Sequence, residues 1–287
     1  MNAPVKEPLR ILAPNPSALT GPGTTTFLIG QDHVAVIDPG PDDDGHLDAI
    51  IKAGNGNISH IFVTHAHRDH SQGAPRLSAM TGAPVLAFGT VTDGRSPVMA
   101  RLAETGLIDG GEGLDHSFIP DIRLTDGQQV VTPDWTLQAL HTPGHAANHL
   151  CFRWDSTIFC GDIVMAWSST LISPPDGDLG DYFRSLDRLA GLAPRRMLPT
   201  HGPAIDDPLP RIDELAHHRR ARTAQIMAAL QQRPDSAAGL ARRLYDVPEH
   251  LLPAAQRNIL SHLIALSQLG AIDFPKNLTA DSFFSTL

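Results

Sequence analysis

Four side chains that can bind a metal ion fall within six residues, directly after a short apolar run. The segment reads THAHRDH from Thr64 to His70 and follows the run IFV. Where a strand enters a tight loop, alternate side chains can turn to one side, so His65 and His67 could share one ion. Asp69 and His70, around the bend, could then bind a second ion. The segment predicts a metal centre at the end of a strand.

Three further candidate ligands follow other apolar runs. His145 lies in the HTPGH after WTLQAL, Asp162 follows TIFCG, and His201 lies in the PTHG after ML. Each sits beside Gly or Pro, as expected where loops present a site at one edge of a rigid sheet. Five histidines and two aspartates suit borderline divalent ions, and a carboxylate such as Asp162 can bridge two of them.

Composition narrows the class of protein. With 287 residues and 41% hydrophobic side chains, we expect one large domain with its own core, plus a small appendage. No run approaches the roughly 18 apolar residues of a membrane helix, and the first residues do not resemble a signal peptide, so we expect a soluble, cytoplasmic protein. The net charge of -9 argues against nucleic-acid binding through a generally basic surface.

The only two cysteines exclude a thiolate-rich metal site. Asp155 and Ser156 predict a hairpin turn that would place Cys151 directly opposite Cys160. In a cytoplasmic protein we expect this pair to be buried, reduced thiols.

Residues 1–205 alternate strand and helix patterns, which predicts a layered α/β domain. Strands are expected at 10–14, 24–30, 33–40, 59–65, 84–88, 135–144, 150–154, 157–162 and 195–202, with helices at 46–54, 73–82 and 182–192. Residues 107–124 are Gly-rich and are expected to be irregular.

Residues 206–287 change to a helical pattern, which predicts a separate helical domain. Helices are expected at 212–232, 236–246 and 251–270, with a closing β segment at 271–274. This part carries nine Lys+Arg and nine Asp+Glu, so the negative charge belongs to residues 1–205. The neutral C-terminal part leaves nucleic acid open as a partner.

The motifs THxHxDH, HTPGH, CGD and PTHG, in this order, resemble those of the metallo-β-lactamase superfamily over residues 20–205. The resemblance implies an αβ/βα four-layer sandwich with a site for two divalent metal ions at one edge. It implies that one ion is held by His65, His67 and His145, the other by Asp69, His70 and His201, with Asp162 bridging. Asp38 would orient a ligand histidine. Zn²⁺ is the first expectation, with Fe or Mn as alternatives.

Departures from individual families narrow the choice. The bridging position is Asp162, where antibiotic-destroying enzymes carry Cys, and position 67 is His rather than the Glu of flavodiiron proteins. The stretch from 145 to 201 is too short for the inserted domain of nucleases that cleave pre-mRNA ends, and there is no flexible arm of the tRNA 3′-processing type.

The segments THAHRDHSQG and NILSHLIALSQLGAID are similar to the beta-lactamase-like protein 2 subfamily. That resemblance implies a winged-helix-like C-terminal domain and, from the subfamily's animal member, endoribonuclease activity on single-stranded RNA. One departure is Asn148, where many relatives carry Asp.

The sequence therefore predicts a metal-dependent hydrolase that uses a metal-bridging hydroxide on an ester-type bond. Asp69 could accept the hydroxide's proton. His149 either contacts a substrate oxygen or, as is commoner for such a histidine, has its hydrogen bonds satisfied within the hairpin. Single-stranded RNA is one expected substrate and a small-molecule ester or thioester, as in glyoxalase II, is the other. An iron-dependent oxidoreductase resembling persulfide dioxygenase also remains open.

Two other features have alternative interpretations. Basic side chains gather on the predicted helix at 212–232, namely His217, His218, Arg219, Arg220 and Arg222. They form either a solvated helix face or a patch that binds phosphate. Trp167, five residues after Asp162, could line the substrate pocket.

Overall fold

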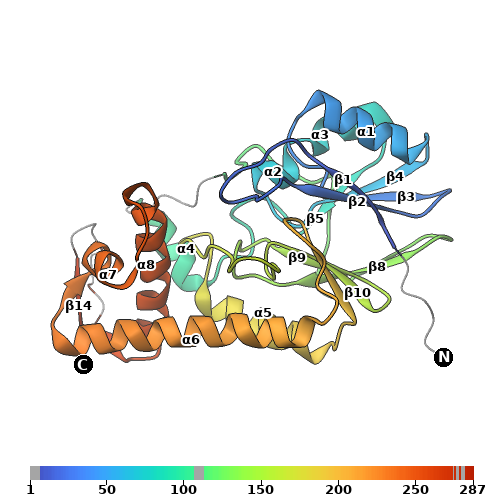
Figure 1. Cartoon of the computed structure of the whole chain (residues 1–287). Helices are drawn as coiled ribbons and strands as arrows, with labels where there is room; N and C mark the ends of the chain where they lie inside the picture. Colours follow the sequence, from blue (N-terminus) through green and yellow to red (C-terminus); the bar gives the residue numbers. More distant parts are fainter. Residues whose placement is uncertain (1–6, 107–112, 274, 276–277, 279–281) are drawn as a thin grey trace.

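The computed structural model describes residues 7–106, 113–273, 275, 278 and 282–287. Two sheets lie face to face with helices on their outer sides (Figure 1). The first sheet has the order β1 (Leu9–Leu12), β2 (Thr25–Ile29), β3 (Val34–Ile37), β4 (Ile58–Phe62), β5 (Val85–Ala87) and β6 (Ile122–Arg123). The second has the order β11 (Arg196–Pro199), β10 (Thr157–Gly161), β9 (Leu150–Trp154), β8 (Thr136–His141) and β7 (Gln129–Val131).

Strand direction explains why the predicted ligands meet. In the first sheet β3, β4, β5 and β6 are parallel, and helices α1 (Asp44–Gly54) and α3 (Ala74–Thr81) provide crossovers between them. In the second sheet β10 is parallel to β11, and β9 is antiparallel to both β10 and β8. Strands β8, β10 and β11 therefore point the same way, and their carboxyl ends lie at one edge.

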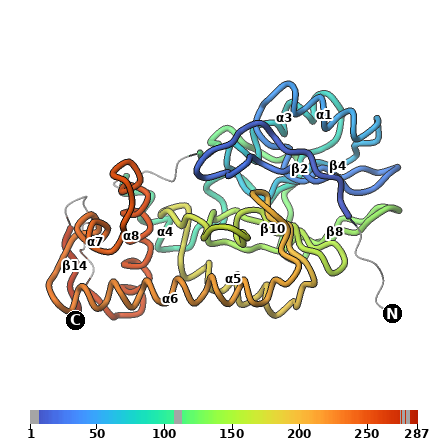
Figure 2. The backbone as a smooth tube through the Cα atoms, in the orientation of Figure 1, coloured from blue at the N-terminus to red at the C-terminus, as the bar shows by residue number. Residues whose placement is uncertain are grey.

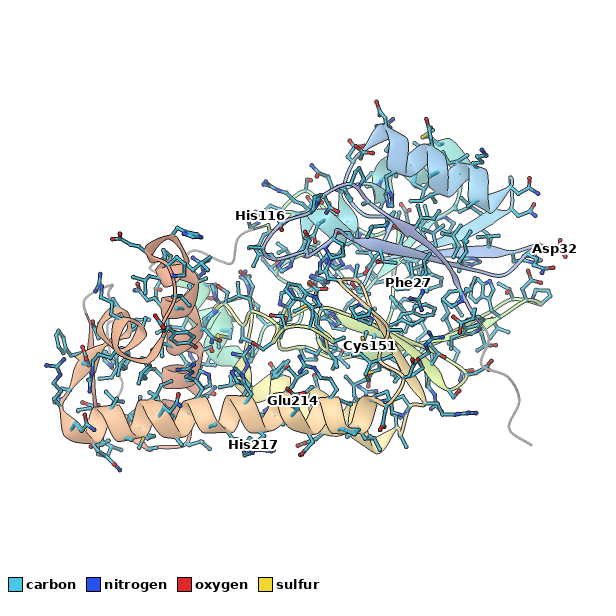
Figure 3. The ribbon with its side chains drawn as sticks, viewed as in Figure 1. Phe27, Asp32, His116, Cys151, Glu214 and His217 are labelled. Atoms are coloured by element: carbon cyan, nitrogen blue, oxygen red, sulfur yellow. The ribbon has the colours of Figure 1, made fainter. Side chains whose placement is uncertain are left out.

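The four-layer αβ/βα sandwich expected from the sequence is confirmed. Aromatic side chains fill the space between the sheets, among them Phe27, which Figure 3 labels, and Phe62 and Phe159. Leu47 of α1 and Leu77 of α3 cover the outer face of the first sheet. Helices α5 (Leu179–Gly191) and α6 (Pro208–Gln232) cover the second sheet.

The C-terminal part is the expected winged-helix domain. It combines the second half of α6 with α7 (Ala237–Leu244), η1 (Glu249–Leu251), α8 (Leu252–Gln268) and a small sheet of β12 (Asp235–Ser236), β14 (Phe283–Thr286) and β13 (Ile272–Asp273). Figure 2 shows α6 running from beneath α5 to the C-terminal helices. Of the predicted closing segment at 271–274, Phe274 lies outside the described residues.

The C-terminal core also takes in a helix from the first 205 residues. Helix α4 (Pro97–Glu104), capped by Ser96, packs Met99 and Leu102 among C-terminal residues such as Ile259. This eight-residue helix was not predicted from the sequence, because one buried pair of apolar residues gives a weak periodic signal. The division of the chain after residue 205 stays a prediction. Of the stretch predicted to be irregular, 107–112 lies outside the described residues, and the rest contains β6.

The predicted hairpin and its thiols are confirmed. Trp154 pairs with Thr157, so the turn has two residues, and Cys151 and Cys160 are free and buried. Burial raises the pKa of the Cys151 thiol to about 12, so it is protonated and unreactive near neutral pH. In the described part of the chain, we find no helix whose length and hydropathy would let it span a membrane.

His262, in the C-terminal core, predicts a loss of stability in acid. Its Nδ1 lies 2.8 Å from the Thr223 hydroxyl, and burial lowers its pKa from 6.5 to about 3. Below pH 6.5 the unfolded chain binds a proton at His262, whereas the folded protein does not bind it until the pH approaches 3. The free energy of unfolding therefore falls as pH decreases from 6.5 toward 3. We expect His262→Leu to reduce the loss between pH 7 and pH 5 by about 2 kcal/mol. Urea unfolding at both pH values measures this.

The control for this prediction is His217→Leu, since His217 is exposed on α6 (Figure 3). An equal acid-induced loss in wild type and His262→Leu would show that His262 does not contribute.

Candidate metal centre

The seven predicted ligands come together at one edge of the sandwich. They form three groups whose donor atoms all lie within 4.8 Å of one another, namely His65, His67 and His145; His65, His70 and Asp162; and Asp69, His70 and His201. Strand β4 supplies the first four ligands through the loop and short helix α2 (Arg68–Ser71) that follow it. The ends of β8, β10 and β11 supply the other three.

In the first group three imidazole nitrogens converge. His67 Nδ1 lies 2.9 Å from His65 Nε2 and 3.1 Å from His145 Nε2. Burial lowers the pKa of His67 to about 3 and lowers that of His145, so both rings are neutral near pH 7. Three neutral imidazoles that bring one nitrogen each to the same point can all turn a lone pair to one cation, which would stabilise the arrangement.

Hydrogen bonds on the far side of the rings fix which nitrogen is free. His145 Nδ1 lies 2.7 Å from Leu171 O, and His201 Nδ1 lies 3.2 Å from Gly23 O. A carbonyl oxygen only accepts hydrogen bonds, so each Nδ1 donates. In the neutral ring, each Nε2 therefore presents a lone pair to the cluster.

Asp38 orients two more histidines, as expected. Its Oδ2 accepts from His70 Nδ1 at 3.0 Å and from the Thr64 hydroxyl at 2.8 Å. Because the Thr64 hydrogen is used in this way, Thr64 Oγ1 accepts from His65 Nδ1 at 3.0 Å. The Nε2 atoms of His65 and His70 are then also free to bind a metal. Asp38 adopts a φ of 52°, and the Thr200 hydroxyl donates to it at 2.9 Å.

Asp162 lies between the groups. Its Oδ2 is 3.4 Å from His201 Nε2, 3.5 Å from His70 Nε2 and 3.8 Å from His145 Nε2. Its Oδ1 is buried and has no hydrogen-bond partner among the described residues. Asp69 Oδ2 lies 3.1 Å from His201 Nε2 on the other side. A buried carboxylate oxygen without a partner is costly unless a cation binds it.

The carboxylates change the protonation of two ligands. Burial alone would lower the pKa of His201, but Asp162 and Asp69 outweigh it and raise that pKa to about 10. The same carboxylates, with Asp38, raise the pKa of His70 well above its usual range. This end of the cluster therefore attracts positive charge, and divalent cations would displace these protons. The donor set fits two such ions.

His149 has the buried, hydrogen-bonded environment that was the alternative to a substrate contact. The ring is fully buried, its Nδ1 lies 3.0 Å from the Thr142 hydroxyl, and its Nε2 accepts from the Asp162 N–H at 3.3 Å. Burial holds the pKa of His149 well below its usual value. A Cβ added at Gly161 would approach His149 Nε2 to 2.5 Å, so the ring and this glycine are tightly packed. This geometry favours a role in positioning Asp162 over a substrate contact.

Asn148 and His141 have structural partners. Asn148 is buried and donates to Thr90 O at 3.0 Å, and the His141 ring stacks on Phe88 with 4.0 Å between centroids.

A cavity of about 430 Å³ opens onto the metal-binding cluster. His67, Asp69, His145, Asp162 and His201 line one end, and Met165, Trp167 and Leu171 line the walls, so the predicted place of Trp167 is confirmed. The C-terminal domain lines the other end with Tyr245, Val247, Leu251, Ala254, Ala255 and Asn258.

Sequence reasoning misplaced one residue of this cavity lining, Arg219. His217, His218 and Arg220 are exposed on α6, but Arg219 is 1% exposed and borders the cavity. The signal was present, since Arg219 falls on the buried stripe of α6, at helical spacing from Leu215 and Ile226.

Comparisons with known proteins agree with this architecture. Residues 19–201 match the model of the Metallo-beta-lactamase superfamily, and residues 236–274 match the Beta-lactamase associated winged helix domain. The Beta-lactamase-like protein 2 homolog of Drosophila melanogaster is 30% identical, over 94% of this chain and 90% of its own.

Two further relatives are informative. The chain is 29% identical to an Atrochrysone carboxyl ACP thioesterase of Aspergillus chevalieri, over 80% of this chain and 68% of that protein. A metallo-beta-lactamase family protein from Thermus thermophilus superposes with a TM-score of 0.77 at 23% identity, covering 98% of both chains. That likeness confirms the fold.

Proposed function

This chain belongs to the metallo-beta-lactamase superfamily, whose members are metal-dependent hydrolases, and we propose that it hydrolyses thioesters of small, largely apolar acyl groups. The observation that carries the proposal is the cavity, which joins the metal-binding cluster to an apolar wall that includes Leu171, Val247 and Leu251. Apolar cavities with a few polar groups at one end are typical of sites for small organic ligands. A relative named as an acyl-carrier-protein thioesterase supports the same bond type.

We propose two metal sites. The free Nε2 atoms and the orphaned carboxylate oxygen support the assignment of His65, His67 and His145 to one ion, Asp69, His70 and His201 to the other, and Asp162 to both. Nitrogen and carboxylate donors suit Zn²⁺, with Fe or Mn as alternatives that metal analysis distinguishes. When bound, such ions lower the pKa of water and polarise a carbonyl oxygen.

The chain's own groups then divide the remaining tasks. Asp69 borders the cavity and accepts the proton that attacking water releases, while His149 holds the Asp162 backbone. Trp167 lines the cavity and packs against Gly202 and Gly21. A Cβ at Gly202 would lie 2.5 Å from Trp167 Cδ1, so the indole packs on bare backbone there. The winged-helix domain, which we propose to be residues 206–287, closes the far end of the cavity and selects the acyl group.

Hydrolysis of single-stranded RNA is the second candidate, and the arginines of the C-terminal domain do not favour it. Arg222 donates to Leu244 O and stacks on Tyr245, and Arg243 pairs with Asp235 at 2.9 Å. Arg219 is buried. These engaged cations offer little to a polyanion, and the net charge of -9 opposes its approach.

A substrate panel tests this choice. We expect protein loaded with Zn²⁺ to hydrolyse the heptanoyl thioester of N-acetylcysteamine and to leave a single-stranded RNA 20-mer intact. The RNA result should hold at both low and high salt, whereas binding of a polyanion would weaken steeply with salt. Cleavage of RNA by wild type and not by Asp162→Ala, without thioester turnover, would contradict the proposal. Oxygen consumption by protein holding one iron would instead support an oxidoreductase.

A further inference from the structure

We propose that Arg219 binds a carboxylate on the acyl part of the substrate, so that the enzyme prefers thioesters of dicarboxylic acids. The inference rests on the proposed thioesterase function and adds the chemistry of the acyl group. It follows from the surroundings of one buried guanidinium on the wall of the cavity.

Arg219 is a buried cation whose hydrogen-bond and ring partners are uncharged. Its Nη1 donates to Asn258 Oδ1 at 2.6 Å, its Nη2 donates to Thr170 O, and its guanidinium carbon lies 5.7 Å from the centre of the Tyr182 ring. Within the described residues, no carboxylate lies within ion-pair distance of Arg219, and its Nε has no hydrogen-bond partner. A buried charge without a counter-ion is costly, which points to a partner that arrives with the ligand.

The other charges of the cavity have their own partners. Asp176 pairs with Arg95 at 2.5 Å, and Asp69 and Asp162 belong to the metal-binding cluster. Arg219 is thus the cation of the described cavity lining that remains for a substrate group. Its planar donor fork suits a carboxylate better than a point charge would.

Its position relative to the reacting bond favours the acyl part. Thr170 accepts from Arg219 through its carbonyl, and its hydroxyl lies 3.0 Å from Nδ1 of the ligand His145. Arg219 is therefore one residue away from the metal-binding cluster, on the C-terminal side of the cavity. A thioester carbonyl at the cluster would direct its acyl chain along this wall.

Two roles of Arg219 have to be distinguished. One is binding of the substrate carboxylate, and the other is a structural role in which its contact with Thr170 holds the segment behind His145. Two variants separate these roles. Arg219→Met removes both the cation and the contact, whereas Asn258→Asp keeps both and adds a carboxylate beside Nη1. Asn258 Nδ2 donates to the Tyr245 hydroxyl at 2.5 Å, and a carboxylate at position 258 would instead accept from that hydroxyl. Asn258→Asp should therefore preserve the fold and neutralise the cation.

The experiment compares two N-acetylcysteamine thioesters of similar length, adipoyl with a free carboxylate and heptanoyl without one. In wild type we expect kcat/KM to favour adipoyl by about 10- to 100-fold, the effect of a hydrogen bond to a charged group. In Arg219→Met and Asn258→Asp we expect the ratio to fall to about one. Arg219→Lys should give an intermediate ratio, because it keeps the charge and loses the planar fork. The control Arg220→Met changes the exposed neighbour and should leave the ratio unchanged.

Three results would overturn the inference. The first is a wild-type ratio near one. The second is an equal fall of kcat/KM for both thioesters in Arg219→Met, together with an unchanged adipoyl-to-heptanoyl ratio in Asn258→Asp. That result would show that Arg219 has a structural role only. The third is a dependence on Arg219 for heptanoyl phosphopantetheine and not for the adipoyl thioester, which would assign the guanidinium to a carrier phosphate.

Binding of free adipate, measured by calorimetry on metal-loaded protein, keeps the inference testable if no thioester is hydrolysed. In that case the absence of hydrolysis refutes the thioesterase function. Adipate binding that weakens at least tenfold in Arg219→Met and Asn258→Asp would still support the anion site. No difference in adipate binding between wild type and both variants would refute the anion site.

Discussion

Asp162→Ala is expected to abolish hydrolysis while the protein stays folded. Asp162 Oδ2 lies within 3.8 Å of three histidine Nε2 atoms and is the donor common to both proposed metal sites. Its loss leaves no group to bridge two cations, and we expect kcat/KM to fall by at least about a thousandfold, or about 4 kcal/mol in the barrier. Metal content by mass spectrometry, kcat/KM and thermal melting measure the three parts of this prediction. His67→Ala should behave in the same way.

The fold should survive because the cluster is separate from the layers that hold the sandwich together. Phe27, Phe62 and Phe159 pack between the sheets in a core that contains none of the proposed metal ligands. Asp48→Ala, at an exposed position of α1, is the matched control and should keep full activity. If Asp162→Ala unfolded at room temperature, the site would have to be structural as well as catalytic.

Asp38→Ala is expected to have the second largest effect, although Asp38 is not a proposed ligand. This fully buried carboxylate accepts from the Thr64 backbone at 2.7 Å and from His70, and it joins β3 to the ends of β4 and β11. Removing it leaves buried donors without a partner, which costs about 3–5 kcal/mol of stability. The freed His70 ring should also weaken metal binding by about 10- to 100-fold. Chemical unfolding and competition with a chelator measure these two quantities.

Asp38→Asn is the informative companion variant. It keeps the volume and one acceptor oxygen for the Thr64 N–H, but its amide would face the donors of His70 and Thr200. We expect metal affinity to fall nearly as far as in Asp38→Ala, with a smaller loss of stability. Wild-type metal affinity in both variants would show that Asp38 does not position His70.

The fold and the metal-binding cluster were predictable because their signals are local. Each candidate ligand follows an apolar strand, and β8, β10 and β11 share a direction, so neighbouring carboxyl ends had to meet. The THAHRDH segment supplies four donors from one strand end, and the resemblance in motif order carried the assignment to two ions. Asp38 could be expected for the same reason, as the end of the neighbouring strand β3.

The features that sequence reasoning missed depend on contacts between distant segments. Helix α4 is short, and its Met99 and Leu102 are buried only because the C-terminal helices pack on them. Arg219 looked like part of a solvated basic face, yet the packing of α6 against α5 and α8 buries it beside Asn258. The sequence left His149 open between a substrate contact and a structural role, and the structural role is favoured by the turn at Gly161, where the Asp162 N–H donates to His149 Nε2.

These contacts change the interpretation of the charges on the C-terminal domain. The balanced C-terminal segment kept nucleic acid open as a partner, but Arg222 and Arg243 are engaged within the domain. What that domain adds to the cluster is an apolar wall with one buried cation. For this reason we propose a small acyl substrate, whereas the motifs alone left both RNA and thioesters open as substrates.

Titration of metal-free protein with Zn²⁺, followed by thioester hydrolysis, tests the central claim most directly. We expect negligible turnover without metal, a rise that reaches its plateau at about two equivalents of Zn²⁺, and no rise in Asp162→Ala. Full thioester turnover by the metal-free protein, or no turnover at any metal loading, would contradict the claim that the protein is a metal-dependent thioesterase.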